Sequence, residues 1–390
     1  MLRRFIRRPH PRGTALRSVA SRPQRGPSVT STATARAPPL RPCFHVRLAS
    51  TTAAPPKIAV VVPDDSPALR ALPLDAEAEL LIGGDISELL AHGDKLQQAE
   101  ALLWIPPASP DVLRELVRGG HLPKLRWMHG FYAGVDAIAS FAKEDIPDIP
   151  LSNGRGAFSS SLAEYALTAA LHFNKQIPRC MDNRRERKWD KFVMGELKGL
   201  TIGLLGAGSI AQATGHLAKA FGMTTVALRR NARKADESGA FDLIVGPYDG
   251  PILPAHKKAL LEQCDVVVCT LPGTPNTTHF MSAAEFAAMK PGAIFVSLGR
   301  GVAVDEVALD EALRHGRLGG VALDVFEVEP LPETSPLWDP IHGERLLLTS
   351  HNADYTETYF QLGWDVWREN LAAFRKGEPP VTPVDKEAGY

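Results

Sequence analysis

Acidic residues are missing from the start of this 390-residue chain, where the first one is Asp64. The stretch before Lys57 contains 11 arginines. The whole chain has a formal net charge of zero, so the rest of it, with 33 basic and 44 acidic residues, is acidic. A leader rich in arginine and serine and poor in acids is typical of an organellar transit peptide. We therefore expect residues 1–50 to direct the protein to the mitochondrial matrix, with the plastid as the alternative destination. The competing interpretation is a disordered basic arm that binds nucleic acid or anionic membrane.

Cysteines and long apolar runs are also scarce. Apart from Cys43 in the leader, the chain has only Cys180, Cys264 and Cys269, and these three show no CxxC or metal-like spacing. We expect the last two to be small core residues, and we expect no metal site. The longest apolar runs, such as 265–272, are far shorter than the roughly 20 residues of a membrane helix. No membrane span is therefore expected, and the acidic body argues against nucleic acid as a partner because it would repel phosphates.

Short apolar segments alternate with amphipathic ones after the leader, a pattern typical of an α/β protein with parallel sheets. A chain of 390 residues with 44% hydrophobic and 23% charged residues can form two domains that each bury a core. We expect two doubly wound parallel-sheet domains. The predicted strands of the first are 57–62, 101–105, 125–128 and 149–151, and the six of the second are 201–205, 225–228, 266–271, 293–297, 321–325 and 346–349.

Helix signals stand between and after these strands. Ser161 and Glu164 have the spacing of a capping box, which predicts a helix from 161 to about 175. A polar and charged stretch, 179–190, follows this helix. A last amphipathic helix is expected at about 356–376, after the final strand.

A glycine-rich turn follows the predicted strand 201–205 and opens a helix. Its sequence runs from Gly206 through Ala207, Gly208, Ser209 and Ile210 to Ala211. Two glycines at this spacing permit a tight turn and let backbone N–H groups reach a pyrophosphate at the helix N-terminus. The turn therefore predicts a dinucleotide site formed by Gly206, Gly208, Ser209 and Ile210. The alternative is a generic turn from a strand to a helix.

The second strand of this domain ends at Leu228, where an enzyme that uses NAD usually carries an acid for the ribose 2′-hydroxyl. Here the chain continues with Arg229, Arg230 and Asn231. Guanidinium groups bind a 2′-phosphate in a bidentate manner, whereas a carboxylate would repel it. We therefore expect the cofactor to be NAD(P), with NADP preferred. If the loop is only a solvated basic turn, the preference is weak.

Three polar side chains follow later strands of the second domain. Arg300 comes after 293–297, Glu329 after 321–325 and His351 after 346–349. Ligands in open α/β sheets bind outside the carboxyl ends of the strands, so these residues are expected to converge beside a nicotinamide. A guanidinium can hold a substrate carboxylate, an imidazolium can protonate an alkoxide, and a carboxylate can orient the imidazole. Arg300, Glu329 and His351 are therefore predicted to be catalytic, although each alone could have a purely structural role.

These segments resemble the D-isomer-specific 2-hydroxyacid dehydrogenase family over about 57–384. The most specific stretches are 271–309, 322–332 and 335–340. The resemblance implies a Rossmann-type cofactor domain, residues 159–353, inserted in a discontinuous flavodoxin-like substrate domain made of residues 56–158 and 354–390. It also implies a homodimer that pairs through the cofactor domain.

The resemblance assigns further site residues. It identifies Arg300, Glu329 and His351 as the catalytic trio and implies that Asp324 orients the nicotinamide carboxamide. It implies that Leu271 and Pro272 contribute to the cofactor site. The backbone N–H groups of Ala133 and Gly134, together with Arg300, would hold the substrate carboxylate.

The implied activity is hydride transfer between NAD(P)H and a small 2-keto or D-2-hydroxy acid, with glyoxylate or hydroxypyruvate as the nearest substrates. Asn352 and Asp354, beside His351, are more polar than the residues usual in the family. This departure puts the usual substrate preference in doubt. The alternative function is a dinucleotide-sensing binding or regulatory protein of the same fold without significant turnover.

Overall fold

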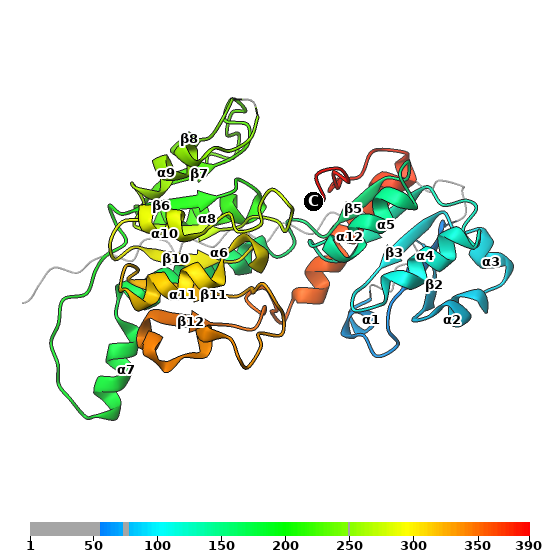
Figure 1. Ribbon diagram of the computed structural model, residues 1–390. Coiled ribbons are helices and arrows are strands. Elements are labelled where there is room, and N and C mark those ends of the chain that lie inside the picture. The colour runs from blue at the N-terminus through cyan, green and yellow to red at the C-terminus, as the bar shows by residue number, and fades with distance from the viewer. Residues whose placement is uncertain (1–54, 73–77, 249) are drawn as a thin grey trace, which may run out of the picture. The chain divides into compact units, whose positions relative to one another are not determined.

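The computed structural model describes residues 55–72, 78–248 and 250–390, so the predicted leader, residues 1–50, lies outside the described residues. The described residues form two parallel sheets (Figure 1). The first has the strand order β2-β1-β3-β4-β5 and the second the order β12-β11-β10-β9-β6-β7-β8. The first sheet comprises β1 (Lys57–Val61), β2 (Glu79–Gly83), β3 (Ala101–Trp104), β4 (Trp127–Gly130) and β5 (Leu151–Asn153). The second comprises β6 (Thr201–Leu205), β7 (Thr224–Leu228), β8 (Leu243–Val245), β9 (Val266–Cys269), β10 (Ile294–Ser297), β11 (Gly320–Leu323) and β12 (Leu346–Leu348).

Helices connect the strands of both sheets. The central strands β3, β9, β10 and β11 are buried along their whole length, because helices cover both faces of a parallel sheet. The α-helices are α1 (Pro67–Arg70), α2 (Ile86–Leu90), α3 (Asp94–Gln97), α4 (Pro110–Arg118), α5 (Ala139–Glu144), α6 (Ser159–Asn174), α7 (Ile177–Arg185), α8 (Ser209–Ala220), α9 (Pro254–Leu261), α10 (Ala283–Ala288), α11 (Glu306–Arg314) and α12 (Tyr359–Lys376). Short 3₁₀ turns lie at η1 (Asp136–Ile138), η2 (Gly301–Ala303), η3 (Pro336–Trp338) and η4 (Pro340–Arg345).

This architecture confirms the predicted class of two parallel-sheet α/β domains, with local differences. Strands β2 and β8 were not predicted, and both lie at a sheet edge, where a strand is less buried and its apolar pattern is weak. The second sheet therefore has seven strands among the described residues instead of six. The polar and charged stretch 179–190 begins within helix α7, which was not predicted.

The predicted capping box at Ser161 is wrong. Helix α6 begins two residues earlier, at Ser159, and the Ser161 hydroxyl donates a hydrogen bond to the carbonyl oxygen of Ala353 at 2.6 Å. A serine inside a helix can donate its hydroxyl to a backbone carbonyl far away in the sequence. Sequence alone does not distinguish such a serine from one that caps the start of the helix. The contact ties the start of α6 to the segment that follows β12.

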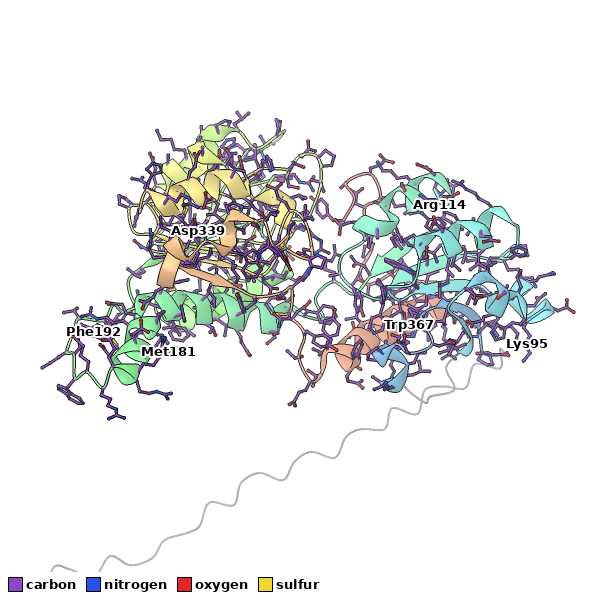
Figure 2. All side chains as sticks on the ribbon, turned by 60° about the horizontal axis from the view of Figure 1, so that its bottom comes forward. Lys95, Arg114, Met181, Phe192, Asp339 and Trp367 are labelled. Atoms are coloured by element: carbon purple, nitrogen blue, oxygen red, sulfur yellow. The ribbon has the colours of Figure 1, made fainter. Side chains whose placement is uncertain are left out.

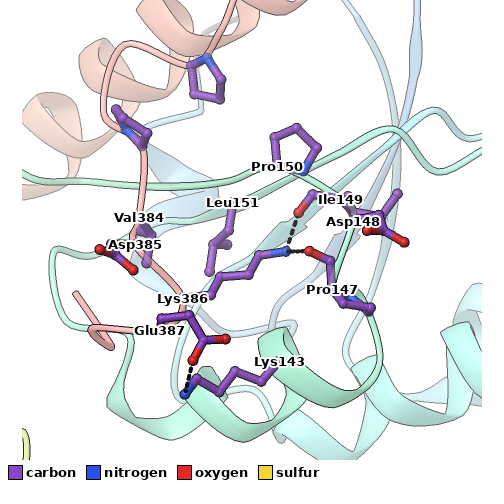
Figure 3. Close-up of a pocket in the computed structure, with 12 residues that line it drawn as sticks. Lys143, Pro147, Asp148, Ile149, Pro150, Leu151, Val384, Asp385, Lys386 and Glu387 are labelled. Carbon is purple, nitrogen blue, oxygen red and sulfur yellow. Dashed lines mark hydrogen bonds and ion pairs between the residues drawn. The ribbon is translucent and has the colours of Figure 1, made fainter.

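Helix α12 returns to the first sheet (Figures 1 and 2). The Trp364 indole N–H donates to the carbonyl oxygen of Ala68 at 2.9 Å, and the Trp367 ring stacks on Trp127 of β4 with the ring centroids 4.9 Å apart. Trp364 is completely buried in the cluster that covers this face of the sheet. The last residues also dock here, because the Lys386 ammonium donates to backbone carbonyls before β5 (Figure 3).

The pocket in Figure 3 is lined by this C-terminal segment and by residues near α5 and β5, and contains none of the predicted site residues. Cys264 and Cys269 are buried core residues, as predicted, and burial raises the pKa of their thiols to about 12 and about 11. Among the helices of the described residues, none combines the length and hydropathy needed to cross a membrane.

Candidate active site

The glycine turn after β6 has the backbone geometry that a pyrophosphate requires. Gly206 has a φ of +103°, which favours glycine, and its N–H donates to the carbonyl oxygen of Leu228 at 3.0 Å. Gly208 is the N-cap of the twelve-residue helix α8. A Cβ atom added to Gly208 would have no described atom within 4 Å, so space remains open at the helix N-terminus. Ser209 and Ile210 form the first turn of α8, where free N–H groups attract anions.

Leu271 lies between this turn and Arg300. A Cβ atom added to Gly206 would be 3.6 Å from Leu271 Cδ2, and the carbonyl oxygen of Leu271 accepts a hydrogen bond from the Arg300 backbone N–H at 3.1 Å. The carbonyl oxygen of the next residue, Pro272, accepts from the Thr277 hydroxyl at 2.6 Å. The fold thus joins the predicted cofactor turn to the predicted substrate-binding arginine through one residue.

The two arginines at the end of β7 differ in their surroundings. The Nε and Nη2 atoms of Arg229 are buried and have no hydrogen-bond partner among the described residues. Arg230 is exposed, and its guanidinium lies over the Tyr390 ring, 5.1 Å from the centroid. Buried donors of a cation without a partner are costly, so Arg229 is suited to an anionic ligand at this position.

Glu329 and His351 are in direct contact. The His351 Nδ1 lies 2.7 Å from Glu329 Oε2, and the other carboxylate oxygen accepts from the Phe326 N–H at 2.9 Å. The His351 side chain is 41% exposed, and its Nε2 has no hydrogen bond with any other described residue. Glu329 therefore fixes the ring and leaves Nε2 available to a substrate.

Asp324 supports the turn that carries His351. This carboxylate is 1% exposed, and its Oδ1 accepts from the Thr349 hydroxyl at 2.7 Å and from the Asn352 N–H at 3.0 Å. The Asp324 carbonyl oxygen accepts from the His351 N–H at 2.8 Å, while His351 has a φ of +50°. A positive φ is unfavourable for histidine, so these bonds hold it in place. The sequence pattern did not indicate this supporting role.

Arg300 contacts the predicted substrate loop. Its Nε donates to Asp136 Oδ2 at 2.9 Å, and its Nη1 donates to the Gly299 carbonyl oxygen at 3.1 Å. A Cβ atom added to Gly134 would lie 1.6 Å from Arg300 Nη2, so only glycine leaves room for the guanidinium. The Asn153 amide fixes the same loop by donating to the Ala133 carbonyl oxygen at 2.6 Å. The fold therefore brings Arg300 together with Gly134 and Asp136 of the segment 133–136, which the resemblance implies to be the substrate loop.

Asp354 lies three residues after His351. Burial raises the pKa of its carboxyl, and the neighbouring charges of His351 and Arg300 oppose that rise. Burial likewise raises the pKa of Tyr132 to about 12, with contributions from Tyr355 and Asp354. Tyr132 was not predicted, although its position directly before Ala133 was a usable signal.

Comparisons with known proteins agree with this geometry. Residues 167–353 match the model of the D-isomer specific 2-hydroxyacid dehydrogenase, NAD binding domain. The hydroxypyruvate reductase of Thermotoga maritima is 32% identical over 268 residues, which cover 66% of this chain and 82% of that protein. A family protein from Aeromonas salmonicida matches with a TM-score of 0.66 and 32% identity, covering 85% of this chain and 99% of its own. A probable 2-hydroxyacid dehydrogenase from Rhizobium etli, in complex with NADP, HEPES and L(+)-tartaric acid, matches with a TM-score of 0.70 and 26% identity, covering 87% and 100%. With its glycine turn and its histidine–glutamate pair at the strand ends, this chain belongs to the D-isomer specific 2-hydroxyacid dehydrogenase family.

Proposed function

We propose that the protein is an NAD(P)-dependent reductase of small 2-keto acids that forms D-2-hydroxy acids, with glyoxylate or hydroxypyruvate as substrate. The observation that carries this proposal is the contact of His351 Nδ1 with Glu329 Oε2 at 2.7 Å. In the same fold, the guanidinium of Arg300 lies against the loop that contains Gly134. The related protein from Thermotoga maritima is a hydroxypyruvate reductase, which supports a small 2-keto acid as substrate.

Each residue then has a defined task. The bound cofactor supplies the hydride to C2 of the keto acid. Arg300 and the N–H groups of Ala133 and Gly134 hold the substrate carboxylate, and Arg300 also polarises the carbonyl group. His351 Nε2 donates a proton to the carbonyl oxygen as that oxygen gains negative charge. Glu329 keeps the imidazole ring in the orientation that this transfer needs.

Steady-state assays of the full chain test the proposal. With NADPH and a panel of glyoxylate, hydroxypyruvate and pyruvate, we expect loss of NADPH absorbance and formation of the corresponding hydroxy acid. Chiral chromatography should identify the D-isomer from hydroxypyruvate and pyruvate, whereas glyoxylate gives achiral glycolate. Tight NADPH binding without turnover of any 2-keto acid would instead favour the dinucleotide-sensing alternative. The similarity to a hydroxypyruvate reductase and to a probable 2-hydroxyacid dehydrogenase supports the enzyme rather than that alternative.

We further propose that NADP is preferred over NAD, with Arg229 as the main 2′-phosphate ligand because two of its buried nitrogens have no partner among the described residues. The related Rhizobium etli protein was crystallised with NADP, which supports this preference. Arg229→Ala should raise the KM for NADPH by about 10- to 100-fold, since it removes charge-assisted hydrogen bonds to the phosphate. The KM for NADH should change by less than about threefold, because NADH has no 2′-phosphate.

Parallel titrations with both cofactors measure this effect. Lys188→Ala, which removes one exposed positive charge from the loop after α7, is the matched control and should leave both KM values unchanged. Equal losses with NADPH and NADH would contradict a phosphate-specific role for Arg229.

The homodimer is also a proposal, supported by an exposed apolar segment. We call residues 177–195, comprising α7 and the loop after it, the arm; Figure 2 shows Met181 and Phe192 on it. Trp189 is 99% exposed, Val193 89% and Met181 55%, and exposed apolar residues gathered in this way mark interaction sites. The arm keeps its shape through Arg179, which pairs with Asp190 at 2.6 Å.

The full chain should therefore have twice the monomer mass in light scattering coupled to size-exclusion chromatography. The double variant Trp189→Ser, Val193→Ser should shift it toward the monomer, because the apolar area available for association is lost. Trp338→Ser removes a tryptophan that is 53% exposed on η3 and is the control. A wild-type monomer at micromolar concentration would contradict the proposal.

The acid-free leader supports a further proposal, import into the mitochondrial matrix, with the plastid as the alternative. The full chain carrying a C-terminal fluorescent protein should colocalise with mitochondria in cells that contain them. Deletion of residues 1–50 should make the fluorescence diffuse. Unchanged localisation after the deletion would contradict a targeting role.

A further inference from the structure

The loop that follows β4 is held by its carbonyl groups. The Ala133 carbonyl oxygen accepts a hydrogen bond from the Asn153 side-chain amide at 2.6 Å. The Tyr132 carbonyl oxygen accepts one from the Gly154 N–H at 3.1 Å. In contrast, the N–H groups of Ala133 and Gly134 donate to no other group among the described residues. The carbonyl groups of the loop are thus fixed, whereas these two N–H groups remain available to a ligand.

Asn153, which holds the loop, is in turn held by Thr382 near the end of the chain. Asn153 is a buried residue at the end of β5. Its N–H donates to the Thr382 carbonyl oxygen at 3.2 Å, and the Thr382 hydroxyl donates to the Asn153 carbonyl oxygen at 2.5 Å. Both backbone groups of Asn153 are therefore paired with the same residue, so its position depends on that of Thr382.

A buried asparagine of α12 orients Thr382. The side-chain amide of Asn370 donates to Thr382 Oγ1 at 3.0 Å, and Asn370 Oδ1 accepts from the N–H groups of Val381 and Thr382 at 3.0 and 3.2 Å. Because Oγ1 accepts from Asn370, the hydroxyl hydrogen is left for the Asn153 carbonyl oxygen. A chain of hydrogen bonds thus runs from α12 through Thr382 and Asn153 to Ala133.

The segment 381–386, which contains Thr382, lies along β5. The Val384 N–H donates to the Leu151 carbonyl oxygen at 2.9 Å. At the far end of the segment, the Lys386 ammonium donates to the Pro147 carbonyl oxygen at 3.1 Å (Figure 3). Strand β5 is at the edge of its sheet, so this segment covers the edge and fixes the end of the strand.

We propose that Thr382 is a positioning residue for the substrate. By holding Asn153, it keeps the loop 131–134 in the conformation whose N–H groups receive the substrate carboxylate. This inference rests on the proposed function, which assigns that carboxylate to the loop. Without the hydroxyl, the loop is less ordered before the substrate arrives, and ordering it weakens binding. Proton transfer from His351 does not depend on Thr382, so the effect falls on substrate binding.

Thr382→Val removes the hydroxyl and keeps the shape of the side chain. In hydrogen–deuterium exchange of the full chain without ligand, the amides of residues 131–135 should exchange about threefold faster or more. With NADPH bound, the Kd for oxalate, an unreactive acid that offers a carboxylate beside a second carbonyl carbon, should rise by about 3- to 10-fold in calorimetric titrations.

Steady-state kinetics of the same variant separate binding from chemistry. The KM for hydroxypyruvate should rise by the same factor as the Kd for oxalate. The kcat and the Kd for NADPH should change by less than about twofold, because only substrate binding is weakened. Thr382→Ser keeps the hydroxyl and should restore values close to those of the wild type.

The matched control is Thr225→Val on β7 of the second sheet. The hydroxyl of the buried Thr225 donates to the Ala240 carbonyl oxygen at 2.9 Å, so this variant loses a comparable hydrogen bond. It should lower the midpoint of thermal unfolding but leave exchange at 131–135 and the Kd for oxalate unchanged. If Thr382→Val is unstable, Lys386→Met loosens the same segment from its far end and should change both quantities in the same direction.

Unchanged exchange at 131–135 in Thr382→Val, or an equal increase in Thr225→Val, would overturn the inference. Faster exchange with an unchanged Kd for oxalate would also overturn it. A wild-type protein that turns over no 2-keto acid would instead overturn the proposed function. The exchange experiment still decides whether Thr382 orders the loop in that case, because it needs no substrate.

Discussion

Replacing His351 with alanine should lower kcat by on the order of 10² or more while the Kd for NADPH stays nearly constant. The reason lies in the contact of Nδ1 with Glu329, which leaves Nε2 as the proton donor for the carbonyl oxygen. Without the imidazole, water must supply this proton, and it is neither held nor oriented. Single-turnover experiments with NADPH and hydroxypyruvate measure the step, and fluorescence titration measures cofactor binding.

A second variant separates chemistry from backbone strain. His351 has a φ of +50°, a conformation that asparagine tolerates better than alanine does. His351→Asn should therefore keep the turn that Asp324 supports but lose as much kcat as alanine, because an amide cannot supply the proton. Activity of either variant within a few-fold of wild type would show that His351 is not the acid.

Arg300→Lys should lower kcat/KM by about 10²-fold or more, even though the positive charge is kept. The guanidinium uses Nε for Asp136, Nη1 for the Gly299 carbonyl oxygen and the space beside Gly134 for Nη2. An ammonium group cannot make these planar contacts and also hold the substrate carboxylate. The loss should be seen with glyoxylate as well as hydroxypyruvate, because both contain that carboxylate.

Arg314→Lys is the matched control for this substitution. Arg314 pairs with Asp310 of α11 and with Asp339, which lies between η3 and η4, each at 2.8 Å, and no predicted site residue takes part in this contact. Arg314→Lys should lower the midpoint of thermal unfolding slightly and leave kcat/KM unchanged. If Arg300→Lys behaves in the same way as this control, Arg300 has a structural role only.

The central part of the fold could be predicted because its signals are local. Strand β9 is a continuous apolar run, β6 is apolar after its first residue, and the glycine turn at Gly206 directly follows β6. The edge strands β2 and β8 have weaker apolar patterns and went unpredicted. The Ser161 hydroxyl was misinterpreted because its acceptor, the Ala353 carbonyl, is 192 residues away in the sequence.

The part of the site that lies at strand ends could be predicted from the sequence. Arg300, Glu329 and His351 each follow a strand of one parallel sheet, so the expectation that they gather at one edge depends on topology alone. Tyr132 and Asp136, the latter in η1, follow strand β4 of the other sheet. Their contacts depend on how two domains meet, and no local pattern encodes that arrangement.

The position of α12 has a consequence for how the protein is made. Trp364 and Trp367 cover an apolar face of the first sheet, yet roughly 200 residues of the cofactor domain are synthesised between that sheet and these side chains. While the ribosome is still translating the cofactor domain, Ile58, Leu103 and Trp127 have no α12 to cover them. The nascent chain therefore exposes an apolar, aggregation-prone surface until α12 has been synthesised. We expect the chain to depend on chaperones during that interval.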